Sequence, residues 1–228
     1  NTFLNSIMKI FLDTADVTEI KTRWTTGLID GITTNPSLIR KSGRNHEDVY
    51  QELKEIGIND ISMEVIGSEV NMISEGKRLH KKFGKCATIK VPCTREGLRA
   101  CAKLSVDNIR VNVTLVFSVA QAILASKAGA TYISPFVGRL DDISFDGVGL
   151  VKDIAALYRE QMVTTQVLAA SLRDVSHAAQ CFSYGADIVT MPTKVFDGMY
   201  DHILTDKGMD IFDKDYAKSI ENLEVTAV

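Results

Sequence analysis

The chain has 228 residues, of which 45% are hydrophobic and 24% charged, and its formal net charge is −3, an ordinary composition for a globular protein. The slight negative charge and the lack of a basic run argue against nucleic acid as the main partner, and no apolar stretch is long enough to cross a membrane. The four cysteines form no CxxC pair and lack zinc spacing, so we expect reduced thiols and a cytoplasmic protein.

The amino-terminal segment 1–7 lacks the charged start and apolar core of a signal peptide. Because Met8 could be a natural start, we expect residues 1–7 to be a leader or upstream extension. No linker rich in Pro, Gly or Ser divides the rest, which predicts a single domain over residues 1–228 with a C-terminal extension over about 205–228.

Short β-prone runs alternate with longer segments of helical period along the whole chain. The expected strands are residues 8–13, 31–35, 61–66, 87–91, 109–114, 131–136, 164–169 and 187–191. The expected helices are residues 16–26, 47–56, 69–83, 95–105, 119–128, 148–160, 175–183 and 195–204. Ser118 is expected to cap one helix, and Ser171 or Asp174 the helix after the seventh strand.

Eight strand–helix units predict an α/β fold, a (β/α)₈ TIM barrel with an additional C-terminal helix. A doubly wound open sheet is the alternative. It usually has fewer strands, and Gly147-Val148-Gly149 lacks the third glycine of a dinucleotide fingerprint. The segment after residue 204 includes an amphipathic stretch, 211–223, which could serve as a lid, a packing arm or a subunit contact.

Lys90 stands in an apolar, β-prone run, Ala87-Thr88-Ile89-Lys90-Val91-Pro92. A strand buried on both faces has this pattern, and burying an ammonium group there is costly. Desolvation favours the neutral amine, which is a nucleophile toward carbonyls, so the run indicates Schiff-base chemistry. The alternatives are a lysine on an edge strand, or one whose stem is buried while its head reaches water.

Polar residues also stand at or just after the end of each expected strand, where the active site of a barrel lies. They are Asp13, Asn35, Glu64, Lys90, Asn112, Thr114, Ser134, Ser171 and Thr190. Each could merely begin a loop or cap a helix, and this is the simpler interpretation of Ser134, Ser171 and Thr190. It explains the charged residues poorly. In a barrel, all these side chains would converge on one small polar substrate.

Six strings that carry these residues resemble, in order, the motifs of a transaldolase. They are Phe11-Leu12-Asp13-Thr14-Ala15-Asp16, Gly31-Ile32-Thr33-Thr34-Asn35-Pro36-Ser37-Leu38, Ile89-Lys90-Val91-Pro92, Asn112-Val113-Thr114-Leu115-Val116-Phe117-Ser118, Ser134-Pro135-Phe136-Val137-Gly138-Arg139 and Leu168-Ala169-Ala170-Ser171-Leu172-Arg173. Over about residues 8–201 the chain resembles the short transaldolase group, which is closely related to the fructose-6-phosphate aldolases.

The resemblance implies transfer of a dihydroxyacetone unit from fructose 6-phosphate to erythrose 4-phosphate, giving sedoheptulose 7-phosphate and glyceraldehyde 3-phosphate in the non-oxidative pentose phosphate pathway. Lys90 matches the lysine that forms the imine, and Asp13 the acid/base of carbon–carbon cleavage. Glu64 matches the group that handles protons during carbinolamine formation and dehydration, through a water near Thr114.

The resemblance also implies the remaining substrate contacts. Asn35 and Asn112 match residues that bind the hydroxyls of the imine, and Arg139, Ser171 and Arg173 match the phosphate site. Two further residues, Thr33 and Phe136, are assigned to the substrate pocket. We expect sugar phosphate substrates, no metal, no organic cofactor, and a homo-oligomer, a pentamer or a decamer by resemblance.

Two positions bear on the choice between transferase and aldolase. The simple aldolases of the group carry glutamine at the position of Glu64 and tyrosine at that of Phe136, and this chain has the transaldolase residue at both. A phenol can assist the protonation that releases free dihydroxyacetone, and a phenyl ring cannot. We therefore expect a transaldolase, with fructose-6-phosphate aldolase as the alternative. A phosphosugar isomerase or epimerase without a covalent step, and a non-catalytic binding barrel, are further alternatives.

Overall fold

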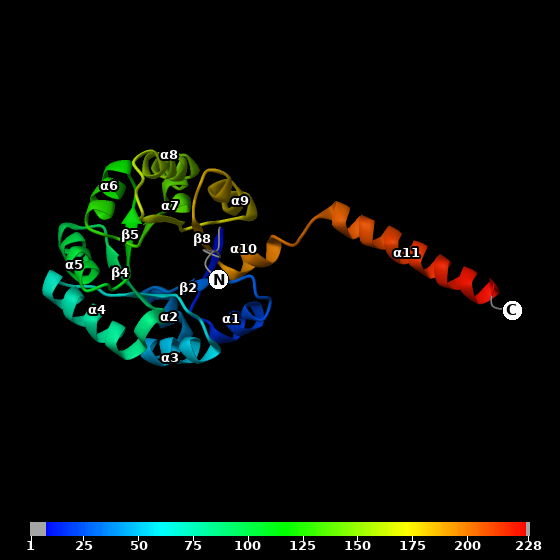
Figure 1. The fold of residues 1–228 in the computed structure, drawn as a ribbon, viewed down its shortest axis with the longest axis horizontal. Coiled ribbons are helices and arrows are strands. Elements are labelled where there is room, and N and C mark those ends of the chain that lie inside the picture. Colours follow the sequence, from blue (N-terminus) through cyan, green and yellow to red (C-terminus); the bar gives the residue numbers. More distant parts are fainter. Residues whose placement is uncertain (1–7, 227–228) are drawn as a thin grey trace.

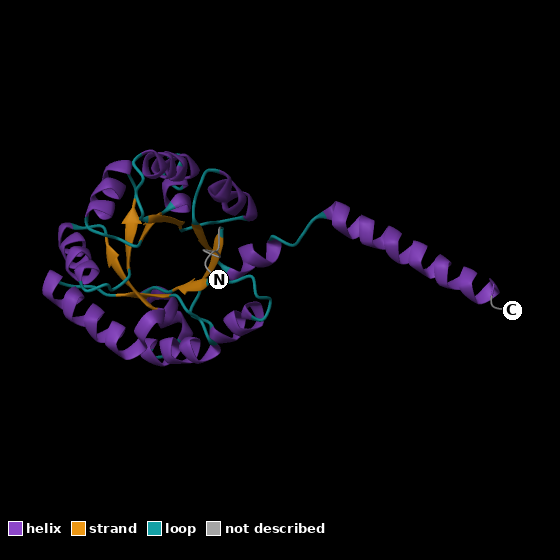
Figure 2. Ribbon diagram, viewed as in Figure 1, coloured by secondary structure: helices purple, strands orange, loops and turns teal. Residues whose placement is uncertain are grey.

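The computed structural model describes residues 8–226, and the side chains of residues 8–220. Eight parallel strands close into a barrel in chain order, so the predicted (β/α)₈ fold is confirmed and the open sheet is wrong. Figure 2 shows the ring of strands inside a ring of helices. The strands are β1 (Lys9–Asp13), β2 (Gly31–Thr33), β3 (Ile61–Glu64), β4 (Ala87–Pro92), β5 (Val111–Val116), β6 (Tyr132–Pro135), β7 (Gln166–Ala169) and β8 (Ile188–Met191).

Helices cover the outside of the barrel, and the last helix extends away from it (Figure 1). They are α1 (Val17–Trp24), α2 (Pro36–Ser42), α3 (His46–Ile56), α4 (Glu69–Phe83), the 3₁₀ turn η1 (Gly84–Cys86), α5 (Arg95–Val106), α6 (Val119–Lys127), α7 (Val137–Asp141), α8 (Gly147–Glu160), α9 (Val175–Ser183), α10 (Thr193–Gly198) and α11 (Ile203–Thr226). The expected cap at Ser118 is confirmed, and Asp174 rather than Ser171 caps α9.

Three helical segments differ from the prediction. The short helices α2 and α7 were not expected, because five to seven residues are too few to show a helical period. The expected helix over 195–204 was wrong, since α10 ends at Gly198 and a separate helix begins at Ile203. That helix, α11, contains the amphipathic stretch 211–223. The expected leader, residues 1–7, lies outside the described residues.

Side chains alternate along each strand between the barrel interior and the surrounding helices. Leu12 and Val189 belong to the large apolar cluster between sheet and helices, whereas Phe11 and Ile188 belong to a small cluster with Tyr132 inside the barrel. The interior cluster fills only the part of the barrel nearer the amino-terminal ends of the strands. At the carboxyl ends of the strands, the interior positions hold polar side chains.

A buried polar network closes the opposite, amino-terminal end. Asp60 is 6% exposed and accepts hydrogen bonds from Thr88 Oγ1 (2.7 Å), Arg110 Nη1 (2.9 Å) and the Tyr132 hydroxyl (2.6 Å). Three donors satisfy one carboxylate, so this charge is held by ionic and neutral partners together. The network links β4, β6 and the residue just before β5 to the loop before β3, and it stabilises the amino-terminal end of the barrel.

No helix among residues 8–226 is both long and apolar enough to cross a membrane. The four cysteines are unpaired, and Cys86, Cys101 and Cys181 are buried. Burial raises the pKa of each of these thiols, which keeps them protonated and poorly reactive. They act as packing groups of the core.

Candidate active site

A pocket of about 120 Å³ lies at the carboxyl ends of the strands. We call it the mouth pocket. The residues given a catalytic or binding role line it, except for Glu64 and Arg173, and the strand-end residues Ser134 and Thr190, which were given no role, line it as well, together with Ala170. Its lining residues are Asp13, Thr33, Asn35, Lys90, Asn112, Thr114, Ser134, Phe136, Arg139, Ala170, Ser171 and Thr190.

Lys90 lies on β4 between β3 and β5, and its residue is 7% exposed. The edge-strand and water-reaching alternatives are therefore wrong. Its Nζ donates to the backbone carbonyl of Thr34 (3.0 Å) and lies 3.1 Å from Glu64 Oε2. Glu64 and Asn112 are its register partners on the neighbouring strands, so the three side chains lie at one level of the barrel. The buried amine is thus surrounded by oxygens as well as by apolar strand.

Asp13 ends β1 and faces the same pocket. Thr33 Oγ1 donates to its Oδ1 (2.9 Å), and because a hydroxyl has one proton, Thr190 Oγ1 must donate the 2.6 Å bond to Thr33. Burial raises the pKa of Asp13, while the nearby charge of Lys90 and the bond from Thr33 act in the opposite direction. A carboxyl of raised pKa can hold and release a proton closer to neutral pH, which suits an acid/base.

Two amide side chains are held in fixed orientations around the lysine. Asn112 Oδ1 accepts from Ser134 Oγ (2.8 Å), and its Nδ2 donates to Ser62 Oγ (3.3 Å). Asn35 caps α2, because its Oδ1 accepts from Leu38 N (2.9 Å). Each amide has two N–H donors. Both therefore keep donors for the hydroxyls of a ligand, without adding charge.

Thr114 comes from an irregular part of β5. The register shifts between Val113 and Val116, and Leu115 has a φ of +60°, as in a β-bulge. Thr114 is 2% exposed, and its Oγ1 has no hydrogen-bond partner among the described residues. A buried, unpaired hydroxyl costs about 1–3 kcal/mol in protein mutational data. This orphaned donor points to a contact with a ligand or a bound water.

The other side of the pocket offers donors for an anion. Ser171 has a φ of +59°, a strained conformation for serine, and its carbonyl accepts from Gly138 N (2.7 Å). A Cβ at position 138 would lie 2.4 Å from that carbonyl oxygen, so only glycine allows this approach. Arg139 stacks over the Phe136 ring (4.9 Å to the centroid) and pairs with no carboxylate of residues 8–220. Its charge is available to a phosphate.

Two predicted residues lie outside the mouth pocket. Arg173 is about half exposed, and its Nη2 pairs with Asp142 Oδ2 at 2.5 Å. Glu64 touches Lys90 but lines a second cavity behind it. Three lining residues, Ser134, Ala170 and Thr190, were given no role in the site from the sequence. Ser134 and Thr190 carry the same signal as the others, a polar residue late in a strand, whereas Ala170 has no polar group that a pattern could reveal.

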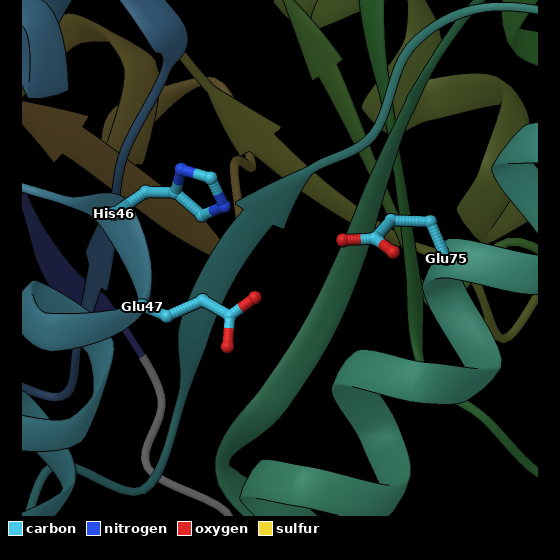
Figure 3. A group of neighbouring side chains, drawn as sticks. All are labelled: His46, Glu47 and Glu75. Carbon is cyan, nitrogen blue, oxygen red and sulfur yellow. The ribbon is translucent and has the colours of Figure 1, made fainter.

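One group of side chains has the composition of a metal site. His46, Glu47 and Glu75 bring possible ligand atoms within 4.8 Å of one another (Figure 3). However, Arg78 bonds both carboxylates and Lys82 bonds Glu47. These two cations already neutralise the carboxylates, so the group is better explained as an ion-pair network at the surface.

The chain matches the family model described as transaldolase/fructose-6-phosphate aldolase over residues 10–227. It is 49% identical over 213 residues to a protein of Cereibacter sphaeroides named probable transaldolase, covering 93% of this chain and 97% of the relative. Proteins of the same name from Paracoccus denitrificans and Caulobacter vibrioides are 51% and 48% identical, covering 93% and 95% of this chain and 98% and 100% of the relatives.

Proposed function

Because this chain belongs to the transaldolase/fructose-6-phosphate aldolase family, we propose that it is a transaldolase that moves a dihydroxyacetone unit from fructose 6-phosphate to erythrose 4-phosphate. The observation that supports this most directly is the buried Lys90 amine, 3.1 Å from Glu64 and in the same pocket as Asp13. The reaction proceeds through an imine on Lys90. A sugar phosphate enzyme whose cysteines are free thiols is suited to the reducing cytoplasm, and we propose this location.

The imine forms in two steps. Glu64 first takes one proton from the Lys90 ammonium group, the neutral nitrogen attacks the ketone carbon, and a second nitrogen proton passes to the ketone oxygen to give the carbinolamine. Glu64 then returns its proton to the carbinolamine hydroxyl, the carbon–oxygen bond breaks with its electrons on oxygen, and the nitrogen lone pair completes the C=N bond as water leaves. The unpaired Thr114 hydroxyl is suited to hold the water between these groups.

Asp13 carries out carbon–carbon cleavage. In its ionised form it takes the hydroxyl proton, the bond to the imine-bearing fragment breaks, and the electrons move into the C=N system to leave an enamine on Lys90. Asp13 returns the proton to the oxygen of the acceptor aldehyde when the new bond forms. Its raised pKa matches both roles, and the bond from Thr33 keeps its carboxylate oriented.

The remaining groups hold the sugar. The amides of Asn35 and Asn112 donate to hydroxyls next to the imine. Arg139 and the strained loop at Ser171 bind the phosphate, which needs donors and positive charge about one sugar length from the imine. Arg173 reaches this phosphate only after it leaves Asp142, so its contribution comes with ligand binding.

The fate of the enamine depends on Phe136. Its ring packs edge-on against Phe117 at 5.6 Å between centroids and lies under the Arg139 guanidinium. The ring has no proton to give, so the enamine waits for an aldehyde acceptor. Fructose-6-phosphate aldolase, which would release free dihydroxyacetone, is the second candidate function.

A coupled assay separates the two. The protein is given fructose 6-phosphate with and without erythrose 4-phosphate, and both glyceraldehyde 3-phosphate and free dihydroxyacetone are measured. We expect sustained turnover only with the acceptor. Equal turnover without it would assign the aldolase instead, and no turnover with retained phosphosugar binding would favour a non-catalytic barrel.

Helix α11 supports a homo-oligomer. Exposed apolar side chains recur on one of its faces at helical spacing, at Met209, Phe212, Tyr216 and Ile220. Such a face is unfavourable in water, and we propose that a second copy of this chain covers it. Light scattering on the full chain should give a multimer that Phe212→Asp with Tyr216→Asp reduces. A monomer in the unsubstituted chain would contradict this.

A further inference from the structure

A second cavity lies behind the catalytic lysine and has a volume of about 430 Å³. We call it the rear cavity. It is lined by the end of β3 and by α2, α3 and α4, on the side of Glu64 away from the barrel axis. Its lining residues include Ile39, His46, Tyr50, Glu64, Ile66 and Glu75.

The two cavities share a wall one side chain thick. Lys90 lines the mouth pocket, Glu64 lines the rear cavity, and their charged atoms are 3.1 Å apart. Thr34 completes the wall: its carbonyl accepts from Lys90, and its Oγ1 lies 3.4 Å from the hydroxyl of Tyr50 in the rear cavity. The side chain of Glu64 is 17% exposed and does not line the mouth pocket. Its exposed part therefore faces the rear cavity.

The rear cavity suits water better than a sugar phosphate. Tyr50, His46 and the carboxylates of Glu64 and Glu75 offer several polar partners, and an ordered water needs two to four. Figure 3 shows His46 and Glu75 pointing toward each other at this side of the barrel. Lys90 already pairs with Glu64 and Arg78 with Glu75, so the positive charge left on this wall for an anion is that of one side chain, Arg40.

The mouth pocket, in contrast, is filled by the substrate during the reaction. It measures only about 120 Å³, and the sugar and its phosphate occupy it while the carbinolamine loses water. The departing water forms beside Glu64, which contacts Lys90 of the mouth pocket and itself lines the rear cavity.

We propose that the rear cavity is the water passage of the reaction, through which water leaves Glu64 during imine formation and returns for imine hydrolysis while the sugar blocks the mouth. This rests on the proposed function. It assigns to Ile66, an exposed residue at this cavity, control over how fast that water exchanges with solvent.

An isotope experiment measures this passage. Fructose 6-phosphate labelled with ¹⁸O at C2 is incubated with the full-length protein and ¹³C-labelled glyceraldehyde 3-phosphate. Mass spectrometry of the recovered fructose 6-phosphate gives ¹⁸O loss and ¹³C incorporation, after correction for non-enzymatic exchange. The ratio of ¹⁸O lost to ¹³C incorporated then reports the fate of the expelled water. If that water escapes to solvent, the ratio is about one or more, since each imine releases the C2 oxygen.

The variants are Ile66→Trp, which narrows the cavity, and Ile39→Phe/Ile66→Trp, which narrows it from two walls. Val70→Trp is the matched control, because Val70 is equally exposed nearby (72% against 69% for Ile66) but does not line the cavity. We expect the ratio to fall about twofold or more in the Ile66 variants, since confined water returns to the imine as often as it escapes. Val70→Trp should match the unsubstituted chain.

The outcomes are distinct. An unchanged ratio in both Ile66 variants, or an equal fall in Val70→Trp, overturns the proposal while leaving the imine intact. If the unsubstituted chain exchanges no ¹⁸O and gives no borohydride adduct, the proposed function itself fails.

Discussion

Thr114→Val should make the protein more stable and much less active. The hydroxyl of Thr114 is buried, at 2% residue exposure, and unpaired among the described residues, so the folded state bears a cost that valine removes. Burial of an unpaired hydroxyl costs about 1–3 kcal/mol, and a bound water recovers part of it, so we take the lower end, about 1 kcal/mol. For a chain of this size that is about 2–4 °C in Tm.

The activity loss should be far larger. If Thr114 holds the water that carries protons to Glu64, its loss removes one proton-transfer path, and such a path contributes about 10²–10⁴-fold. Steady-state kinetics with both sugar phosphates measure kcat, and calorimetry or urea unfolding measures stability. The decrease should appear in kcat more than in KM.

Thr88→Val is the matched control, and it should lower the stability of the fold, whereas Thr114→Val should raise it. Thr88 is also buried inside the barrel, but its hydroxyl donates to Asp60 at 2.7 Å. Losing a bond to a charged group should cost about 1.5–3 kcal/mol while leaving the catalytic groups in place. Our reasoning is refuted if Thr114→Val destabilises as Thr88→Val does, or if it retains full kcat.

Three further substitutions test other parts of the site and fold. Asp60→Ala leaves Thr88, Arg110 and Tyr132 without their acceptor. Breaking a buried ion pair costs about 3–5 kcal/mol, and because the Arg110 side chain is 33% exposed we expect the free energy of unfolding in urea to fall by about 2–3 kcal/mol. A fall below about 0.5 kcal/mol would contradict the role of this network. Thr33→Val removes a hydrogen bond that lowers the pKa of Asp13, so the acid limb of the pH profile of kcat/KM, which reports ionisation of this base, should move to higher pH. Thr33→Ser keeps the hydroxyl and should leave the acid limb in place. An acid limb that moves to lower pH in Thr33→Val would oppose the assignment of Asp13 as the base. Phe136→Tyr, tested with and without Glu64→Gln, should raise the share of free dihydroxyacetone in the product mixture, and an unchanged share would mean that these positions do not set the outcome.

Much of this arrangement follows from the sequence because strand-end residues in a closed parallel barrel must face one another. The alternation of strand and helix signals predicts the barrel, and the polar residue late in each strand predicts the contents of the mouth pocket. Asp13, Lys90 and Asn112 were found in this way, each as a polar group in an otherwise apolar run. The burial of Lys90 is a direct consequence of a central strand.

Other features depend on contacts that no local pattern records. Arg173 and Asp142 lie 31 residues apart, and only the fold brings them together. The left-handed backbone at Ser171 occurs in a residue type that seldom adopts it, so it leaves no trace in composition. Glu64 faces the rear cavity because α2 forms a second wall beside it, and that short helix was not expected.

The central claim is that a covalent imine forms on Lys90, and borohydride reduction tests it most directly. The protein is incubated with fructose 6-phosphate, reduced, weighed intact and mapped by peptide mass spectrometry, with Lys90→Met as the control. We predict a single three-carbon or six-carbon adduct on the peptide that contains Lys90 and none in the variant. An adduct that survives Lys90→Met, or no adduct in an enzyme that turns over, would contradict the mechanism.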